Sequence, residues 1–168
     1  MITYRLALPT EADTLKSLLW QHGQNEWNYL TEDGVNAEFE LLERGAASAV
    51  VAVQDDEIIG CSVLIDATHS PDYLNKYTHQ KLMYFIGDVV VASQHGGKGI
   101  ATALLQACIT QAREVGAEVV LIERHEENLA SAGMMRKAGF HILDTFHDPE
   151  KRSAGSQNSC ILAIELGA

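Results

Sequence analysis

The clearest hydrophobic pattern in the chain lies between residues 82 and 115. An apolar run covers residues 82–91 and is interrupted only by Gly87 and Asp88, which predicts a buried strand. A polar turn and a glycine-rich segment, residues 96–101, follow it. Beyond this segment, apolar side chains recur at helical spacing and would share one face: Ile100, Leu104, Cys108, Ala112 and Val115. The stretch therefore predicts a strand, a glycine-rich loop and an amphipathic helix.

Similar patterns predict elements on both sides. Apolar runs favour six further strands, over residues 2–8, 47–53, 58–65, 119–123, 142–146 and 160–166. Helical spacing favours three further helices: one running from the N-cap segment at residues 9–13 toward Gln21, one from Thr31 to Gly45, and one from Asn128 through Ala138. In the first helix, Asp13 stands at the capping-box position. This order predicts an α+β fold around one mixed, mostly antiparallel sheet.

Length and composition narrow the class of protein. The 168 residues favour one domain spanning residues 1–168, and 46% hydrophobic with 21% charged residues fits a soluble globule. A net charge of −11 argues against nucleic acid or an anionic membrane as a partner. The cysteines lack disulfide or zinc spacing, the histidines show no metal-ligand spacing, and we expect no metal. Without a signal peptide or a run long enough to span a bilayer, a cytoplasmic protein is expected.

The glycine-rich segment favours a phosphorylated cofactor, because a helix N-terminus offers unpaired N–H groups and partial positive charge. A nucleoside-triphosphate loop is excluded, since Lys98 is followed by Gly99 rather than by Ser or Thr. A dinucleotide loop is weakened because Thr102 stands where a third glycine or alanine belongs. It stays open, however, since Glu123 at the end of the next strand could imitate the acid that binds ribose.

Two motifs resemble the GNAT superfamily of N-acetyltransferases. The segment Gly96-Gly97-Lys98-Gly99-Ile100-Ala101 resembles the core of motif A, which commonly reads Arg/Gln-Gly-x-Gly-x-Gly/Ala. The segment from Asn128 to Phe140 resembles motif B, with agreement at Asn128, Ser131, Gly139 and Phe140. The order of predicted elements resembles the GNAT fold over essentially the entire chain, in which the fourth and fifth strands splay apart.

The resemblance implies that acetyl-CoA is the cosubstrate and that the acetyl group passes directly to an amine. It implies cofactor-binding residues in the central strand, the glycine-rich loop and the last helix: Val89, Val90, Val91, Gly96, Gly97, Lys98, Gly99, Ile100, Ala101, Asn128 and Ser131. The backbone N–H near Val91 would polarise the thioester carbonyl and act as the oxyanion donor. Asp88 is the nearest candidate for the general base. Alternatively, Asp88 has a structural role, in which its carboxylate hydrogen-bonds neighbouring backbone groups.

Two positions depart from the family pattern. Gly96 replaces the usual Arg or Gln of motif A, and Met135 replaces the tyrosine that often protonates the leaving thiolate. Methionine cannot donate a proton. His125 and Glu126 are alternative bases, although a solvated charged loop explains them more simply.

The sequence thus predicts an acyltransferase that acetylates a primary amine of a small molecule or peptide. A non-catalytic acyl-CoA-binding or sensing module, favoured by Gly96 and Met135, is the alternative, with a dinucleotide-binding domain as a third. The acceptor is left open because the segments that would form its pocket, residues 23–44 and 69–83, carry no motif. A homodimer is a family-level expectation.

Overall fold

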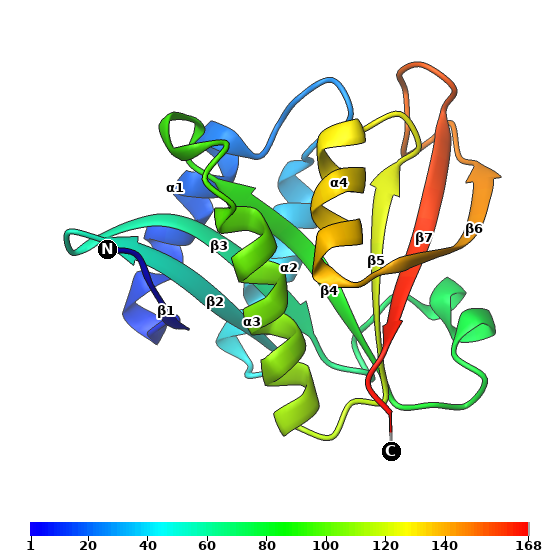
Figure 1. Cartoon of the computed structure of the whole chain (residues 1–168), viewed down its shortest axis with the longest axis horizontal. Helices are drawn as coiled ribbons and strands as arrows, with labels where there is room; N and C mark the ends of the chain where they lie inside the picture. The colour runs from blue at the N-terminus through cyan, green and yellow to red at the C-terminus, as the bar shows by residue number, and fades with distance from the viewer. Residues whose placement is uncertain (168) are drawn as a thin grey trace.

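The computed structural model describes residues 1–167 and contains a seven-stranded sheet in the order β1-β2-β3-β4-β5-β7-β6 (Figure 1). The strands are β1 (Thr3–Leu6), β2 (Ala47–Gln54), β3 (Glu57–Ile65), β4 (Met83–Val91), β5 (Val119–His125), β6 (His141–His147) and β7 (Asn158–Glu165). Neighbouring strands are antiparallel except for β4 and β5, which are parallel. The predicted α+β organisation around one mixed sheet is confirmed.

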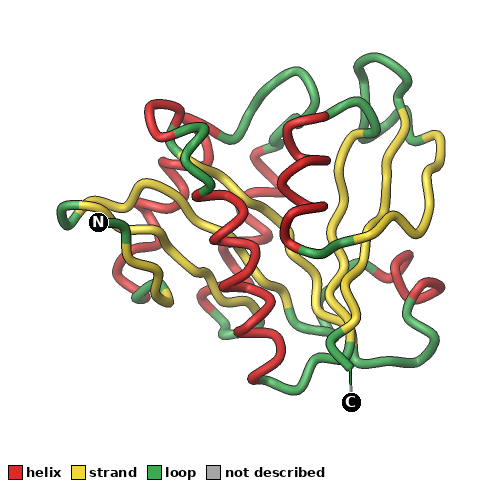
Figure 2. The backbone as a smooth tube through the Cα atoms, viewed as in Figure 1, coloured by secondary structure: helices red, strands yellow, loops and turns green. Residues whose placement is uncertain are grey.

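Within residues 1–167, four α-helices and three short 3₁₀ turns surround the sheet (Figure 2). The helices are α1 (Ala12–His22), α2 (Glu32–Glu43), α3 (Ile100–Glu114) and α4 (Leu129–Ala138); the turns are η1 (Pro9–Glu11), η2 (Asp72–Tyr77) and η3 (Ser93–His95). All four predicted helices are present. Within residues 1–167, no helix combines the length and the apolar character that crossing a bilayer requires.

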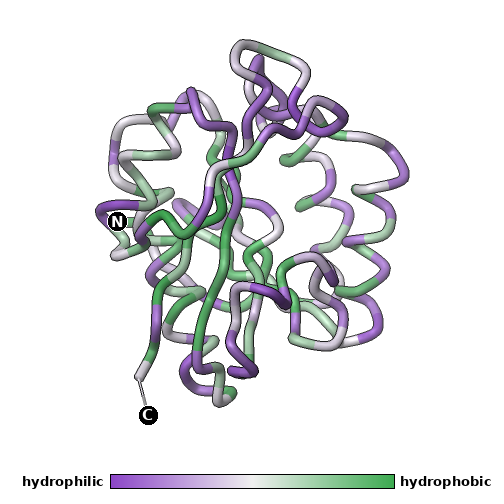
Figure 3. Tube along the Cα trace, turned by 90° about the vertical axis from the view of Figure 1, so that its right-hand side faces the viewer, coloured by the Kyte–Doolittle hydropathy of each residue, from purple (hydrophilic) through white to green (hydrophobic). Residues whose placement is uncertain are grey.

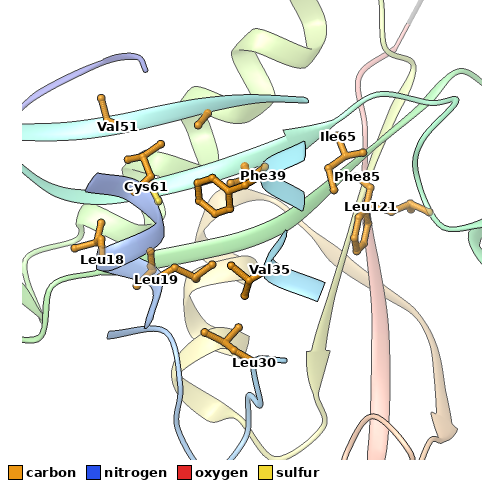
Figure 4. Close-up of a cluster of buried hydrophobic side chains, with 14 of the residues drawn as sticks. Leu18, Leu19, Leu30, Val35, Phe39, Val51, Cys61, Ile65, Phe85 and Leu121 are labelled. Atoms are coloured by element: carbon orange, nitrogen blue, oxygen red, sulfur yellow. The ribbon is translucent and has the colours of Figure 1, made fainter. Parts of the chain in front are cut away.

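The helices cover both faces of the sheet and create two separate cores. Side chains of α1 and α2 pack on one face with residues such as Val51, Phe85 and Leu121 (Figure 4). Side chains of α3 and α4 pack on the other face with residues such as Ile86 and Ile122. Figure 3 shows the strands between these layers as mainly hydrophobic segments. The three cysteines are buried and free, as expected of small core residues.

The strand pair in the middle of the sheet opens toward one end. β4 and β5 pair over four positions only, from Met83–Val119 to Ile86–Ile122, although both strands continue further. At the same point the ladder between β3 and β4 shifts register, because Val63 pairs with Asp88 and Leu64 with Ile86. Gly87 is the extra residue of this bulge, and bulges bend a strand and end regular pairing. The expected splaying of the fourth and fifth strands is therefore present.

The start of the first helix differs from the prediction. Residues 9–11 form a 3₁₀ turn before α1, and no side chain caps α1 at Glu11. Instead, the Glu11 carboxylate accepts the Leu8 N–H at 2.7 Å and pairs with Arg5 at 2.8 Å. The carboxylate that accepts a backbone N–H at this turn is thus Glu11 rather than Asp13. The reason is that the turn begins with Leu8 as its N-cap, before Pro9.

Candidate active site

A cavity of about 650 Å³ occupies the gap where β4 and β5 part. Its walls include the unpaired end of β4 from Gly87 to Val91, the end of β5, the first turns of α4, and segments of α2 and η2. Residues from both faces of the sheet line it, so the opening connects the side of α3 and α4 with the side of α1 and α2. A cavity of this kind lets two reactants meet through the sheet.

The glycine-rich loop leads from η3 into α3. Gly97 and Gly99 have φ of 78° and 77°, a backbone conformation that residues with a side chain rarely adopt. Gly99 is the N-cap of α3, and its carbonyl accepts the first intrahelical bond, from Ala103 N–H at 3.1 Å. The N–H groups of the first helical turn therefore have no partner inside the helix. Exposed Lys98 lies next to this end, with its Nζ 3.2 Å from His95 Nδ1.

One predicted contact of this loop is already used. The Gly96 N–H donates to the carbonyl of Ser93 at 3.2 Å, so it closes the η3 turn. The donors that remain at this end belong to residues 97–102. Gly96 therefore has a structural role in the turn. Because it has no long side chain, Lys98 is the cationic residue next to the start of α3.

The end of β4 offers main-chain groups to the cavity. Ala92 N–H donates to Ile59 carbonyl at 2.8 Å, and hydrogen-bonded and non-bonded pairs alternate along an antiparallel ladder. The Gly60–Val91 pair is consequently non-bonded, as is the Ser62–Val89 pair two positions earlier. The N–H groups of Val89 and Val91 thus face away from β3, toward the gap that β5 has left.

Helix α4 begins beside these groups. The Asn128 side chain caps it, because its Oδ1 accepts the Ser131 N–H at 3.2 Å, and Gly139 ends the helix in the left-handed conformation. Asn128 and Ser131 both line the cavity. Since capping uses the Oδ1 of Asn128, its Nδ2 group is the part of the amide that can reach a ligand. Met135, at 3% exposure, fills the cavity wall with an apolar side chain at the motif B position.

Two carboxyl groups meet on the α2 side of the cavity. Asp88 stands directly after the bulge in β4, and Glu38 of α2 lies over that bulge with 8% of its surface exposed. Burial, followed by the neighbouring Asp88, raises the pKa of Glu38 well above its usual value. Burial also raises the pKa of Asp88, while the Glu38 carboxyl acts in the opposite direction. The predicted candidate base is therefore half of a buried acidic pair.

His125 is a structural residue, and its predicted place in a solvated loop is wrong. It is the last residue of β5, pairs with Ser159 and is 1% exposed. Its Nδ1 accepts the Glu127 N–H at 2.9 Å and its Nε2 donates to the Ala154 carbonyl at 2.7 Å. Because both ring nitrogens are used, this imidazole holds two loops together and cannot take a proton from a substrate.

A polar network closes the cavity on the side of η2. The Tyr73 hydroxyl donates to Glu123 at 2.5 Å and accepts from Lys151 Nζ at 2.8 Å, while Lys151 pairs with Glu123 at 3.1 Å. Next to it, Arg152 Nε donates to Ser159 Oγ at 2.9 Å. Burial first, and then Glu123, raise the pKa of Tyr73 above its usual range. Glu123 is thus committed to this network.

Sequence reasoning missed Glu38, Tyr73 and Lys151. Glu38 had a usable signal, because it lies three residues after Val35 and beside Phe39, on the apolar stripe of its helix. A charged residue on the apolar stripe of a helix is either buried with the stripe or breaks its contact with the core, so its position is informative. Tyr73 and Lys151 had no such signal, because 78 residues separate them in the chain.

Comparisons with known proteins indicate the family of this chain. The family model described as the acetyltransferase (GNAT) family matches residues 12–140. The uncharacterized N-acetyltransferase YobR of Bacillus subtilis (strain 168) is 33% identical over 67 residues, a match covering 40% of this chain and 27% of that protein.

Two solved structures show the same fold. An acetyltransferase of Bacillus subtilis in complex with CoA superposes with a TM-score of 0.72 and 20% identity, over 99% of both chains. The yncA protein of Salmonella typhimurium, solved with its cofactor acetyl-CoA, superposes with a TM-score of 0.76 and 19% identity, over 100% of this chain and 95% of that one.

Proposed function

The chain belongs to the GNAT family of acetyltransferases, enzymes that use acetyl-CoA, and from this premise we propose that it moves an acetyl group directly to a primary amine of a small molecule or peptide. The observation that carries the proposal is the cavity between the parted strands. It brings main-chain donors of β4 and the start of α4 together with a buried acidic pair from the opposite face.

Of the residues that would hold acetyl-CoA, those of β4 and the start of α4 line this cavity, whereas the glycine-rich loop lies outside its lining. The N–H groups of residues 97–101, with Lys98 beside them, fit a diphosphate. The N–H groups of Val89 and Val91 fit an amide-rich arm laid along β4, and the Nδ2 group of Asn128 would reach the same arm from α4. When bound, acetyl-CoA supplies an acetyl thioester at the point where the strands part.

Acetyl transfer requires an oxyanion donor and a general base from the chain. The Val91 N–H would polarise the thioester carbonyl, and Asp88 would take a proton from the ammonium group of the acceptor. The acceptor nitrogen then forms its bond to the acetyl carbon as the carbon–sulfur bond breaks. Of the two protons that the ammonium loses, one ends on the CoA thiol and the other passes to solvent.

Met135 leaves protonation of the thiol to water. A CoA thiolate is a fairly good leaving group, so acid catalysis at this position contributes less than removal of the ammonium proton. We therefore expect turnover without a side-chain acid from α4.

The proposal is tested by binding and by turnover. Calorimetric titration should show binding of acetyl-CoA and no binding of NAD, which separates this function from a dinucleotide-binding domain. A thiol-release assay with polyamines, amino acids, aminoglycosides and short peptides should then show acetyl-CoA consumption with at least one amine. Binding of acetyl-CoA without release above background for any amine would contradict the enzyme and favour the sensing module.

A further inference from the structure

The buried acidic pair is built from two elements that the bulge in β4 brings together. A methyl group placed on Gly87 would lie 2.5 Å from Glu38 Oε1, so the Glu38 carboxyl occupies the space that a side chain at residue 87 would fill. Asp88 is the next residue and faces the same side of the sheet, because it pairs with Val63 of the α1 and α2 core. Both carboxyl groups line the cavity.

One oxygen of this pair lacks a partner. Among the residues that the structure describes, Glu38 Oε1 is buried and accepts no hydrogen bond. Leaving a carboxyl oxygen buried and unsatisfied costs free energy, which points to a ligand that supplies the missing donor. Glu38 and Asp88 both line the cavity, so a donor bound there would lie against this carboxyl pair.

Within residues 1–167, no cation contributes to the pKa of either carboxyl. Asp88 of β4 is the charged group that acts on the pKa of Glu38, and Glu38 is the one that acts on Asp88. From β3, the Cys61 thiol faces both carboxyls, and they contribute to raising its pKa. In a poorly solvated site two adjacent carboxyls do not both ionise, so at least one of them holds a proton.

We propose that Glu38 and Asp88 form one proton-sharing site that binds the ammonium group of the acceptor. Asp88 is the ionised member that accepts the ammonium proton. Glu38 is the protonated member, donating its hydrogen to Asp88 and offering Oε1 to the ammonium. This rests on the proposed function and refines it. The preferred acceptor is an alkylammonium ion, because it neutralises the pair, whereas an uncharged aromatic amine does not.

Three variants test the division of roles through kcat/KM for n-butylamine as a function of pH. Asp88→Asn should lower kcat/KM by about 100-fold or more, the scale of a lost general base. Glu38→Gln should lower it by less than about tenfold, because the amide N–H still donates to Asp88 and the amide oxygen still faces the cavity. Glu38→Ala should lower it by about 100-fold and move the acid limb to higher pH, because Asp88 loses the donor that holds its pKa down.

A matched control lies on the same helix. Glu40→Gln changes an exposed glutamate of α2 and should leave the kinetics unchanged. Acetyl-CoA affinity, measured by calorimetry, should stay within about twofold in all variants, since none of them touches the cofactor side of the cavity. Aniline should be a far poorer acceptor than n-butylamine for the parent protein.

Distinct results would overturn the pair and the proposed function. If Glu38→Gln were as damaging as Asp88→Asn, Glu38 would be the ionised base; if Glu38→Ala left the acid limb in place, the carboxyls would not be coupled. Either result rejects the proton-sharing site while acetyltransfer stands. If the parent protein released no thiol with any amine, the proposed function would fail. The pair would still be tested by titrating n-butylammonium into the CoA-bound protein. Asp88→Asn should abolish this binding, and binding retained in Asp88→Asn would reject the ammonium site.

Discussion

At the scale of single residues, the two glycines of α4 illustrate how backbone conformation decides the effect of a substitution. Gly133 lies inside the helix, and a methyl group added there would meet no atom within 4 Å. Gly139 ends the helix with φ of 107°, and a methyl group there would approach Ile164 at 3.0 Å. The same substitution to alanine therefore has opposite consequences six residues apart.

We expect Gly133→Ala to raise the free energy of unfolding by about 0.5–1 kcal/mol, because alanine loses less conformational entropy in a helix. Gly139→Ala should lower it by about 1–2 kcal/mol, because the left-handed conformation is strained for alanine. Urea unfolding of both variants measures the two effects. Equal shifts of the same sign would contradict the capping geometry at Gly139.

At the scale of elements, the loop between β6 and β7 is held against the cavity by side chains from other parts of the chain. Lys151 reaches Tyr73 of η2 and Glu123 of β5, and Ser156 N–H donates to Glu127, in the segment between β5 and α4. These contacts place the loop over the side of the cavity that faces η2. Its composition alone gave no reason to expect this position.

Replacing Lys151 with methionine should release this loop while leaving the fold intact. The lysine is 43% exposed, so loss of its ion pair should cost less than about 1 kcal/mol of global stability. Amide hydrogen exchange of residues 148–157 should become faster, and KM for the amine should rise with acetyl-CoA affinity unchanged. An exchange pattern identical to that of the parent protein would show that Lys151 does not hold the loop.

The elements themselves were largely predictable because their signals are local. The strand, glycine-rich loop and helix of residues 82–115 and the capped helix after Asn128 follow from periodicity and end residues that lie within a few positions. The start of α1 was misplaced because Glu11 is used by Arg5 and Leu8, and this choice depends on how the chain enters the turn. His125 was misread because its charged neighbours suggest a loop, whereas pairing with β7 buries it.

At the scale of the whole molecule, the candidate site depends on a sheet that does not close. Four residue pairs join β4 to β5, and the bulge at Gly87 turns the rest of β4 away. The glycine-rich loop, the start of α4 and Asp88 carry local sequence signals. The pairing of Asp88 with Glu38 does not, because the two residues come together only when α2 packs on the bulge.

The buried Glu38–Asp88 pair should lower the free energy of unfolding as the pH rises. A carboxyl group whose pKa is raised in the folded state stabilises the fold below its unfolded pKa and loses that contribution as the pH rises toward the folded value. For Glu38 the loss begins above its usual pKa of 4.5 and extends upward, since burial and Asp88 both raise its pKa.

The double variant Glu38→Gln, Asp88→Asn carries neither carboxyl group. Its melting temperature should therefore exceed that of the parent protein, by more at pH 8 than at pH 5, although it should be inactive. Thermal unfolding across this pH range measures the difference, and a constant gap would show that the pair does not titrate between folded and unfolded states.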